Sequence, residues 1–256
     1  MDEKAAVETL RQLKEVFDKY GLEFWLDCGT LLGAIRDKRI IPWDHDIDLG
    51  ILESESKKFF STFEKLRQNG FNVRYTENDN SVAIFKDSKK KCFISISIYE
   101  IEGDKAVTSS LVNDKYYVYH KDGIKIRRSH LLSIFLVRYI LWLLSAPKFI
   151  GDKPAIIPRF LHISLTKIFR FAPSIYRQKI TGYIESIVIK FGFRHRKREV
   201  SLKYFEKFSE IIFYGMKFKV PSKPEDYLAY KYGNNWKIPK RDYNCFTEEG
   251  TFRRKK

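Results

Sequence analysis

Cysteine is scarce in this chain, and its scarcity excludes two kinds of small protein. The three cysteines, Cys28, Cys92 and Cys245, are odd in number and far apart. They fit neither a disulfide framework nor the paired spacing of zinc ligands. Long apolar runs are lacking too, because the most hydrophobic stretch, 131–144, is too short to span a bilayer and contains Arg138. We therefore expect a folded globular protein without disulfides or a membrane span.

The first residues lack the basic and then apolar order of an export signal. We therefore expect a cytoplasmic protein, with peripheral attachment at the inner face of the cell membrane as an additional expectation. The segment 131–144 has basic residues on both sides. It is either a buried core helix or an interfacial helix that contacts anionic lipid.

The charge balance is strongly basic. Lys and Arg number 48 against 32 Asp and Glu, which gives a formal net charge of +16. This excess indicates an anionic partner, such as a phosphorylated substrate or an anionic membrane surface. The basic residues are scattered and form no single nucleic-acid motif, so we do not expect nucleic acid as a partner. One basic cluster, 194–198, is predicted to be an exposed turn.

The apolar patterns predict an α/β (α+β) fold with a mixed, largely antiparallel sheet flanked by helices. Helical spacing of apolar residues predicts helices at 5–20, 53–69, 157–171, 174–191 and 224–232. Alternating or β-branched runs predict strands at 25–26, 71–76, 81–86, 91–102 and 213–220, and a hairpin that joins 115–120 to 124–127.

These elements suggest three parts. Residues 1–128 are predicted to form a catalytic core, and residues 201–256 are predicted to complete it. Between them, 129–200 is predicted to be a helical insertion that lies near a membrane or binds the acceptor substrate.

Three aspartates are the strongest candidates for chemistry. Asp44, Asp46 and Asp48 alternate with other residues and lead into an apolar run, so we expect a strand with all three carboxylates on one face. Residues two apart on a strand lie roughly 6.5–7 Å from each other. Carboxylates this close either raise one another's pKa or share a cation, for which Mg²⁺ or Mn²⁺ is the natural choice. The alternative is a solvated acidic turn.

The residues before the acids have the composition of a phosphate site. Gly29 and Thr30 are predicted to form a tight turn that opens a helix at 31–35. Glycine lets the backbone approach a ligand closely, and a helix N-terminus offers free N–H groups to phosphate. Arg36 adds a planar guanidinium fork. The predicted substrate-binding residues are Gly29, Thr30, Arg36 and Trp43.

Two segments at opposite ends of the chain resemble one known family. Residues 29–36 read GTLLGAIR, and residues 41–48 read IPWDHDID. Together they resemble the signature of the LicD/fukutin-type phosphotransferases, which belong to the nucleotidyltransferase superfamily. The family's closing segment is similar to this chain at Phe218, Pro221, Leu228, Tyr232, Gly233, Trp236 and Pro239. The middle of the chain, 131–198, matches no motif.

The resemblance implies a nucleotidyltransferase-like core and a metal-dependent reaction. A phospho-alcohol group, phosphocholine or a phosphopolyol, would move from a CDP-linked donor such as CDP-choline or CDP-ribitol to a hydroxyl of a glycan or lipid-linked glycan. The setting would be cell-surface polysaccharide, such as lipopolysaccharide or teichoic acid, and CMP would leave. Asp46 and Asp48 would hold Mg²⁺ (or Mn²⁺). Asp44 is predicted to be a further ligand or the base for the acceptor.

One position departs from the family pattern. A third carboxylate would fall at Ser97, and serine cannot replace it as a metal ligand or base of similar strength. Asp44, Glu100 and Glu102 are the alternatives. Two other functions stay open: a nucleotidyltransferase that uses an NTP directly, and a non-catalytic, membrane-associated nucleotide-binding protein.

Overall fold

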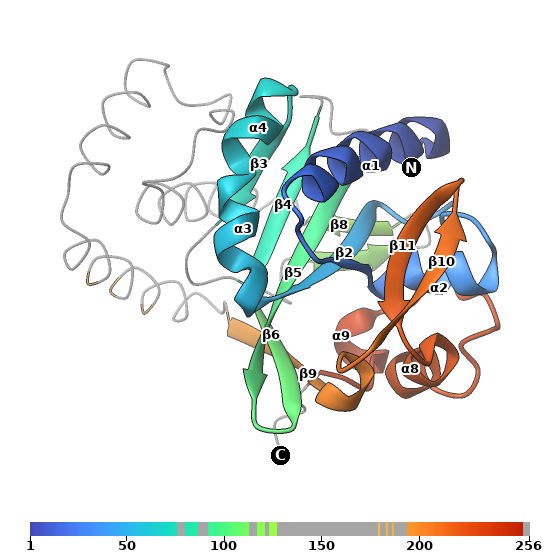
Figure 1. The fold of residues 1–256 in the computed structure, drawn as a ribbon. Helices are drawn as coiled ribbons and strands as arrows, with labels where there is room; N and C mark the ends of the chain where they lie inside the picture. The colour runs from blue at the N-terminus through green and yellow to red at the C-terminus, as the bar shows by residue number, and fades with distance from the viewer. Residues whose placement is uncertain are drawn as a thin grey trace.

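A mixed sheet covered by helices makes up the described part of the computed structural model, which comprises residues 1–75, 80–86, 92–112, 117–120, 123–126, 179, 183, 186 and 194–252 (Figure 1). The helices described are α1 (Glu3–Lys19), α2 (Cys28–Arg36), α3 (Ser56–Ser61), α4 (Phe63–Gln68), α8 (Pro224–Tyr232) and α9 (Cys245–Glu248). The strands described are β1 (Trp25–Leu26), β2 (Asp46–Leu52), β3 (Asn72–Tyr75), β4 (Ser81–Phe85), β5 (Phe93–Glu102), β6 (Lys105–Val112), β7 (Tyr117–His120), β8 (Gly123–Ile126), β9 (Arg194–Ser201), β10 (Phe208–Phe213) and β11 (Met216–Pro221).

Within the described ranges, nine strands form one sheet in the order β10-β11-β1-β2-β5-β4-β3, and β6 extends it from β5 and carries β9. Two pairs, β1 with β11 and β2 with β5, are parallel, and the other pairs are antiparallel. Strands β7 and β8 form the predicted hairpin. The mixed, largely antiparallel sheet confirms the predicted α/β fold class.

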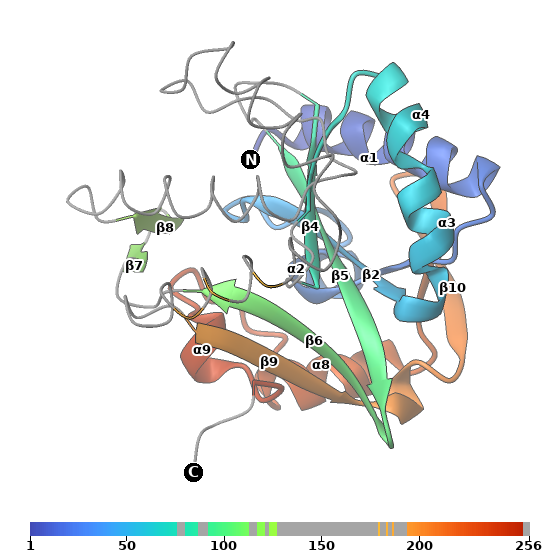
Figure 2. The ribbon, with the colours of Figure 1, turned by 90° about the vertical axis from the view of Figure 1, so that its left-hand side faces the viewer.

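The core lies between the sheet and the helices α1, α3 and α4, which gather on one side of it in Figure 2. The apolar positions of α1 recur with helical period, so Leu10, Leu13 and Phe17 share one face and are fully buried. Phe17 meets Phe59 of α3 edge to face, with ring centroids 5.8 Å apart. Ile47 of β2 supplies the facing apolar surface and is also fully buried.

The predicted helix 53–69 is wrong in one respect, because the structure divides it. A 3-10 turn at Glu53–Glu55 precedes α3, and α3 and α4 are separated at Thr62. The hydroxyl of Thr62 donates to the carbonyl of Phe59 at 2.7 Å, and the backbone N–H of Thr62 donates to the same oxygen. This i to i−3 pattern tightens the helix locally.

The predicted single strand 213–220 is also wrong, because it contains a turn. Phe213 ends β10 and Met216 begins β11, and the two residues pair across the hairpin. Tyr214 and Gly215 make the two-residue connection, both with positive φ, 50° and 73°. Such a turn matches the right-handed twist of paired strands, and glycine tolerates it without strain.

The end of the chain reaches back to its beginning. Lys219 of β11 lies beside Trp25 of β1 in parallel register. After α8, Trp236 is buried, and its carbonyl accepts a long hydrogen bond from Arg36 Nη1 at 3.5 Å. The C-terminal motif therefore contacts β1 and the end of α2.

The described helices include none that is long and apolar enough to cross a membrane. The segment 131–144 and the helices predicted at 157–171 and 174–191 lie outside the described residues, apart from single positions.

Candidate active site

Strand β2 carries two of the three predicted acids. Asp46 and Asp48 lie on the half-buried face of the strand, while Ile47 and Leu49 between and after them are fully buried on the other face. Asp44 precedes the strand, where its backbone N–H donates to the carbonyl of Ile41 at 3.0 Å. The prediction of one strand with three acids is therefore wrong for Asp44, which belongs to the turn that leads into β2.

Helix α2 starts beside these acids. It begins at Cys28 with Asp27 as its N-cap, so Gly29 and Thr30 belong to its first turn. The prediction of a tight turn at these two residues is wrong. The Gly29 N–H donates to Asp48 Oδ2 at 3.0 Å, and the Thr30 hydroxyl accepts the Asp48 N–H at 2.8 Å. These reciprocal bonds fix β2 against the start of α2, where helix N–H groups favour negative charge.

Gly29 is needed because the acids come so close. A Cβ atom at this position would overlap the Asp44 carboxylate and would lie 3.4 Å from Asp48 Oδ2. The carboxylates of Asp44 and Asp48 therefore meet at the same point of α2, although Asp44 is not in the strand. Position 29 accepts no larger residue without displacing one of them.

Burial raises the pKa of all three acids, and neighbouring carboxylates add to the rise at Asp46 and Asp48. Burial raises the pKa of Asp48 to about 7, and the charges of Asp44 and Asp27 add to the rise. The pKa of Asp46 lies well above its ordinary value, first because of burial and then because of Asp48 and Asp44. Burial also raises the pKa of Asp44. Like charges held this way favour a bound cation.

The residues present fit a divalent ion bound by two carboxylates, which would take its remaining ligands from water and substrate. Among the described residues, no group of three His, Cys, Asp or Glu side chains is arranged to hold a metal. The register of the sheet explains this. On this face β5 places Phe93 beside Asp46, Ser95 beside Asp48 and Ser97 beside Gly50, and none of these side chains is a carboxylate.

Of the other two predicted substrate-binding residues, Arg36 lies away from the acids and Trp43 directly precedes Asp44 in the chain. Arg36 is at the far end of α2, and its guanidinium holds Asp37 by two bonds, Nε to Oδ1 at 2.8 Å and Nη2 to Oδ2 at 2.7 Å. Trp43 is half-buried, with the guanidinium carbon of Arg241 5.0 Å from its ring centroid. The described structure thus brings together Gly29, Thr30, Asp44, Asp46 and Asp48, and places Arg36 at the opposite end of α2.

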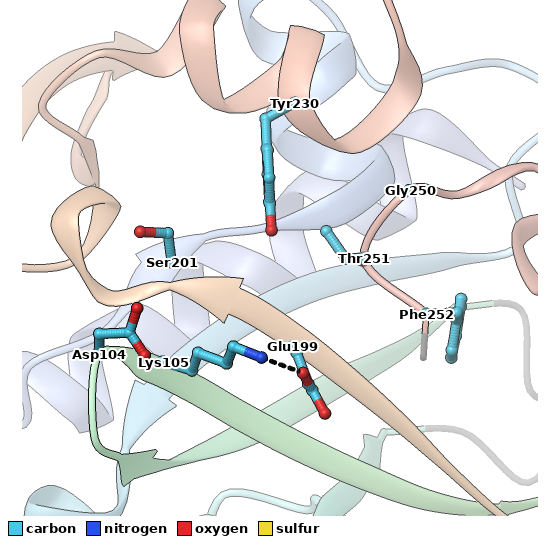
Figure 3. A pocket seen from close by; sticks show the side chains of 8 residues that line it. All are labelled: Asp104, Lys105, Glu199, Ser201, Tyr230, Gly250, Thr251 and Phe252. Carbon is cyan, nitrogen blue, oxygen red and sulfur yellow. Dashed lines mark hydrogen bonds and ion pairs between the residues drawn. The ribbon is translucent and has the colours of Figure 1, made fainter. Parts of the chain in front are cut away.

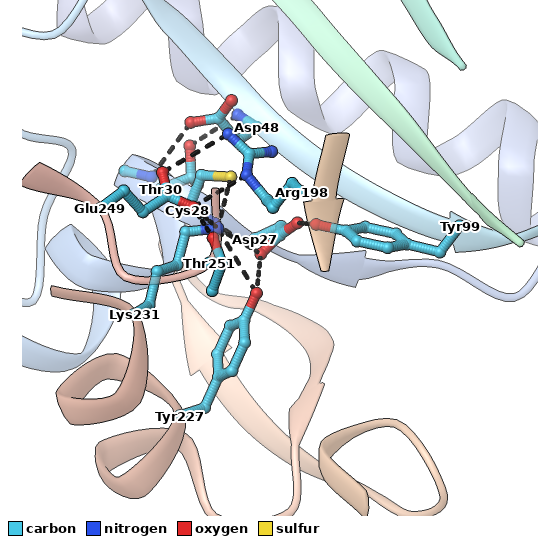
Figure 4. Close-up of polar contacts among 11 residues, drawn as sticks. Asp27, Cys28, Thr30, Asp48, Tyr99, Arg198, Tyr227, Lys231, Glu249 and Thr251 are labelled. Carbon is cyan, nitrogen blue, oxygen red and sulfur yellow. Dashed lines mark hydrogen bonds and ion pairs between the residues drawn. The ribbon is translucent and has the colours of Figure 1, made fainter. Parts of the chain in front are cut away.

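A buried ionic network lies directly behind the acids, and sequence reasoning missed it (Figure 4). Asp27, fully buried, accepts hydrogen bonds from the Tyr99 hydroxyl at 2.6 Å and the Tyr227 hydroxyl at 2.8 Å. The ammonium of Lys231, also fully buried, lies 3.7 Å from Asp27 Oδ1 and 3.4 Å from Glu249 Oε1. The residues of this network come from the β1–α2 junction, β5, α8 and the C-terminal segment, so no local sequence pattern predicts that they meet.

Cys28 joins this network from the first position of α2. Its sulfur lies 3.1 Å from the Lys231 ammonium. Burial raises the pKa of the Cys28 thiol well above its ordinary value. Its φ of 44° is in the left-handed region, which costs strain in a residue other than glycine. The network therefore holds the backbone that presents Gly29 to Asp48.

The exposed basic turn predicted at 194–198 is wrong, because this segment is strand β9, paired with β6. Arg198 is mostly buried, and its Nε lies 2.8 Å from Glu249 Oε1. The alternation of Arg194, Arg196 and Arg198 in the sequence could have indicated a strand, since alternate residues of a strand share a face.

A separate cleft of about 200 Å³ lies near β9 (Figure 3). Its lining residues are Asp104, Lys105, Glu199, Ser201, Tyr230, Gly250, Thr251 and Phe252. Glu199 and Ser201 alternate with Arg198 along the strand, so they face the other side of β9. The cleft includes none of the acids of the candidate site.

Comparison with known proteins finds a family whose match includes the residues of the candidate site. Residues 21–148 match the model of a family described as LicD/FKTN/FKRP, nucleotidyltransferase domain. An uncharacterized protein of Rickettsia prowazekii is 28% identical over 109 residues, which cover 43% of this chain and 39% of that protein. This chain thus matches about two fifths of that relative's length.

Two relatives carry functional names. The lipopolysaccharide cholinephosphotransferase LicD of Haemophilus influenzae is 24% identical over 241 residues, 87% of this chain and 85% of that protein. The human ribitol 5-phosphate transferase FKRP is 50% identical over 48 residues, which are 19% of this chain and 10% of that protein. The described acids and the start of α2 lie within the matched family region.

Proposed function

Since the chain belongs to the LicD/FKTN/FKRP nucleotidyltransferase-domain family, we propose that it is a phosphotransferase that acts on a glycan. It moves a phospho-alcohol group, phosphocholine or a phosphopolyol, from a CDP-linked donor to a hydroxyl of a glycan or lipid-linked glycan. Relatives named as a cholinephosphotransferase and a ribitol 5-phosphate transferase support this choice of transferred group.

One observation carries the proposal: Asp46 and Asp48 share a half-buried face of β2 that is bonded to the first turn of α2. A diphosphate needs both a cation and N–H donors, and this arrangement offers a place for each. The raised pKa values of the two acids indicate that the site favours added positive charge.

In the proposed reaction, Asp46 and Asp48 would hold Mg²⁺ or Mn²⁺. When bound, such an ion neutralises charge on the transferring phosphoryl group. Asp48 also keeps α2 in place through the Gly29 N–H, so the helix start remains directed at the donor. The protein's part in phosphoryl transfer is mostly positioning and charge stabilisation.

Asp44 is the candidate base for the acceptor hydroxyl. Its Oδ1 accepts the N–H of His45 at 2.9 Å, and its carboxylate lies at the start of α2 beside Asp48. A carboxylate of raised pKa takes a proton more readily than an ordinary one. The acceptor oxygen would attack phosphorus as its proton passes to Asp44, and the phosphorus–oxygen bond to CMP would break.

The test is calorimetric titration with CDP-choline, CDP-ribitol, CDP-glycerol and CTP, each with Mg²⁺ and with chelator. We expect metal-dependent binding of one CDP-alcohol, lost in Asp48→Asn and kept in Asp18→Asn, which changes an exposed acid of α1. Turnover with that donor should release CMP. Preference for CTP with release of pyrophosphate would favour a nucleotidyltransferase instead, and binding without turnover would favour a non-catalytic protein.

A further inference from the structure

The proposed donor carries a diphosphate, and the arginine predicted to bind it is engaged elsewhere. Arg36 pairs with Asp37 through its Nε and Nη2, its Nη1 donates a long hydrogen bond to the Trp236 carbonyl, and its side chain is only 8% exposed. It also stands at the last residue of α2, about 10 Å along the helix from Gly29 at 1.5 Å per residue. A diphosphate bound at the acids would therefore need cations other than Arg36.

Strand β9 offers two such cations on one face. In its register with β6, Arg198 lies beside Thr108 and Arg196 lies beside Ser110. Alternate residues of a strand share a face, so Arg196 and Arg198 point to the same side, roughly 6.5–7 Å apart at the backbone. The residue between them, Lys197, points to the other side and pairs with Glu102 at 3.2 Å.

Arg198 is held in a fixed orientation. Its Nε lies 2.8 Å from Glu249 Oε1, and its Nη2 donates to Glu249 Oε2 at 3.5 Å. The ring of Phe252 lies 4.9 Å from its guanidinium carbon. Arginine carries five N–H donors in a rigid fork, and the carboxylate occupies only one edge of it. The Nη1 edge is left for another anion.

Arg198 also faces the acids. Figure 4 shows its guanidinium between Cys28 and Asp48, on the side of the network nearest β2. Its charge lowers the pKa of both Asp46 and Asp48, against the stronger effect of burial. A guanidinium on the same side as carboxylates that would hold a metal is suited to donate hydrogen bonds to the phosphates of a ligand bound there.

We infer that Arg196 and Arg198 bind the phosphate oxygens of the nucleotide donor, in place of Arg36, and that Glu249 is the positioning residue for Arg198. The inference rests on the proposed function for the identity of the donor, but it requires only a ligand with a metal-bound diphosphate. Planar guanidinium groups suit such a ligand because each can donate two parallel hydrogen bonds to phosphate oxygens.

The experiment measures binding of inorganic pyrophosphate and of CDP, each with Mg²⁺, and of cytidine as a probe without phosphate. Arg196→Gln should weaken binding of both phosphate probes about tenfold to a hundredfold, as expected for lost hydrogen bonds to a charged group, and leave cytidine unchanged. The matched control, Lys197→Gln, lies on the opposite face of the same strand and should change binding less than about twofold. Equal effects of the two variants would overturn the inference.

Arg198 requires a different design, because its removal alone would take away one of the two cations that pair with buried Glu249. Arg198→Gln combined with Glu249→Gln removes both charges, and thermal unfolding shows whether the fold is kept. In the folded variant, the same loss of phosphate binding is expected, whereas Arg36→Gln should keep phosphate binding. Loss in Arg36→Gln together with retention in the double variant would contradict the assignment.

The outcomes separate this inference from the proposed function. If the wild-type protein binds Mg²⁺-pyrophosphate through Arg196 but transfers no phospho-alcohol, the arginine assignment stands and the proposed reaction fails. If the protein turns over a CDP-alcohol and Arg196→Gln retains full affinity for CDP, the proposed reaction stands and the arginine assignment fails.

Discussion

Two groups of buried acids lie side by side in this protein, and their pKa values move in opposite directions. Burial alone would raise the pKa of Asp27, but Lys231, Arg198 and the Tyr99 hydroxyl outweigh it, and the pKa lies below its ordinary value. Asp48 is also buried, and its pKa rises to about 7. Two buried aspartates on neighbouring segments thus have pKa values shifted in opposite directions.

The difference lies in charge balance. In the network, the cations Lys231 and Arg198 face the anions Asp27 and Glu249, so the charges are matched within the described structure. In the acid cluster, Asp48 has hydrogen-bond donors from α2 but also like-charged neighbours. Paired buried charges fix the side chains that carry them. A cluster of like-charged carboxylates, in contrast, is stabilised when it binds a cation. We therefore interpret the buried ionic network as structural and the acid cluster as the candidate ligand site.

The largest effect is expected when one carboxylate of the acid cluster is neutralised. Asp46→Asn should reduce transferase activity by at least about a thousandfold, because charge stabilisation of the transferring group is lost. The melting temperature should stay the same or rise, since repulsion from Asp48 and Asp44 is relieved. Activity and thermal unfolding are measured on the same preparation. Full activity in the variant would refute the role of Asp46.

Neutralising the network should have the opposite outcome. Asp27→Asn should lower the free energy of unfolding by about 3–5 kcal/mol, because Lys231 loses one of its two buried carboxylate partners and the buried charges no longer balance. Urea unfolding measures the loss. As the control, Asp27→Asn combined with Lys231→Met should cost less than the sum of the two single changes, because both charges leave together. Additive effects would show that the pair does not act as a unit.

A third variant would strengthen the site with a carboxylate. Ser95 lies beside Asp48 in the parallel register, whereas Ser97 lies one pair further along, beside Gly50. Ser95→Asp should tighten Mg²⁺ binding about tenfold, equivalent to 1.4 kcal/mol, and Ser97→Asp should tighten it less. Calorimetry with Mg²⁺ alone compares them. A larger gain at Ser97 would place the missing carboxylate there.

The smallest expected effect is on pH dependence. In chelator, Asp48 binds its proton more tightly in the folded state than its ordinary pKa allows, so stability is gained as the pH falls from about 8 to 5. The gain should be on the order of 1 kcal/mol and absent in Asp48→Asn. Thermal unfolding at several pH values measures it.

Asp27 makes stability depend on pH in the opposite direction, which the same experiment can measure. Its pKa is depressed, so its stabilisation is present above its ordinary pKa and lost only in stronger acid. A fall in the stability of the wild-type protein between pH 8 and 5, in chelator, would contradict the assignment of the raised pKa to the acid cluster.

Much of the fold was readable from local patterns. The helical spacing of Leu10, Leu13 and Phe17 predicted α1, and the alternating or β-branched runs predicted β3, β4 and β5. The errors arose where a turn interrupts an apolar run. Thr62 divides a helix and Tyr214 divides a strand, although the apolar periodicity continues through both places. Periodicity reports which side is buried, and it does not report where the chain bends.

The sequence by itself determined the acids, the glycine beside them and the family, because these residues are adjacent in the chain and their spacing expresses their chemistry. Only the tertiary structure decided which cations face them. Lys231 and Arg198 are distant from Asp27 and Asp48 in sequence and meet them only after β9 and α8 pack against the sheet. Electrostatic interactions depend on separation in space and on burial, and neither is encoded in local spacing. For that reason Arg36 was predicted at the phosphates from local spacing, whereas our proposal of Arg196 and Arg198 depends on the pairing of β9 with β6.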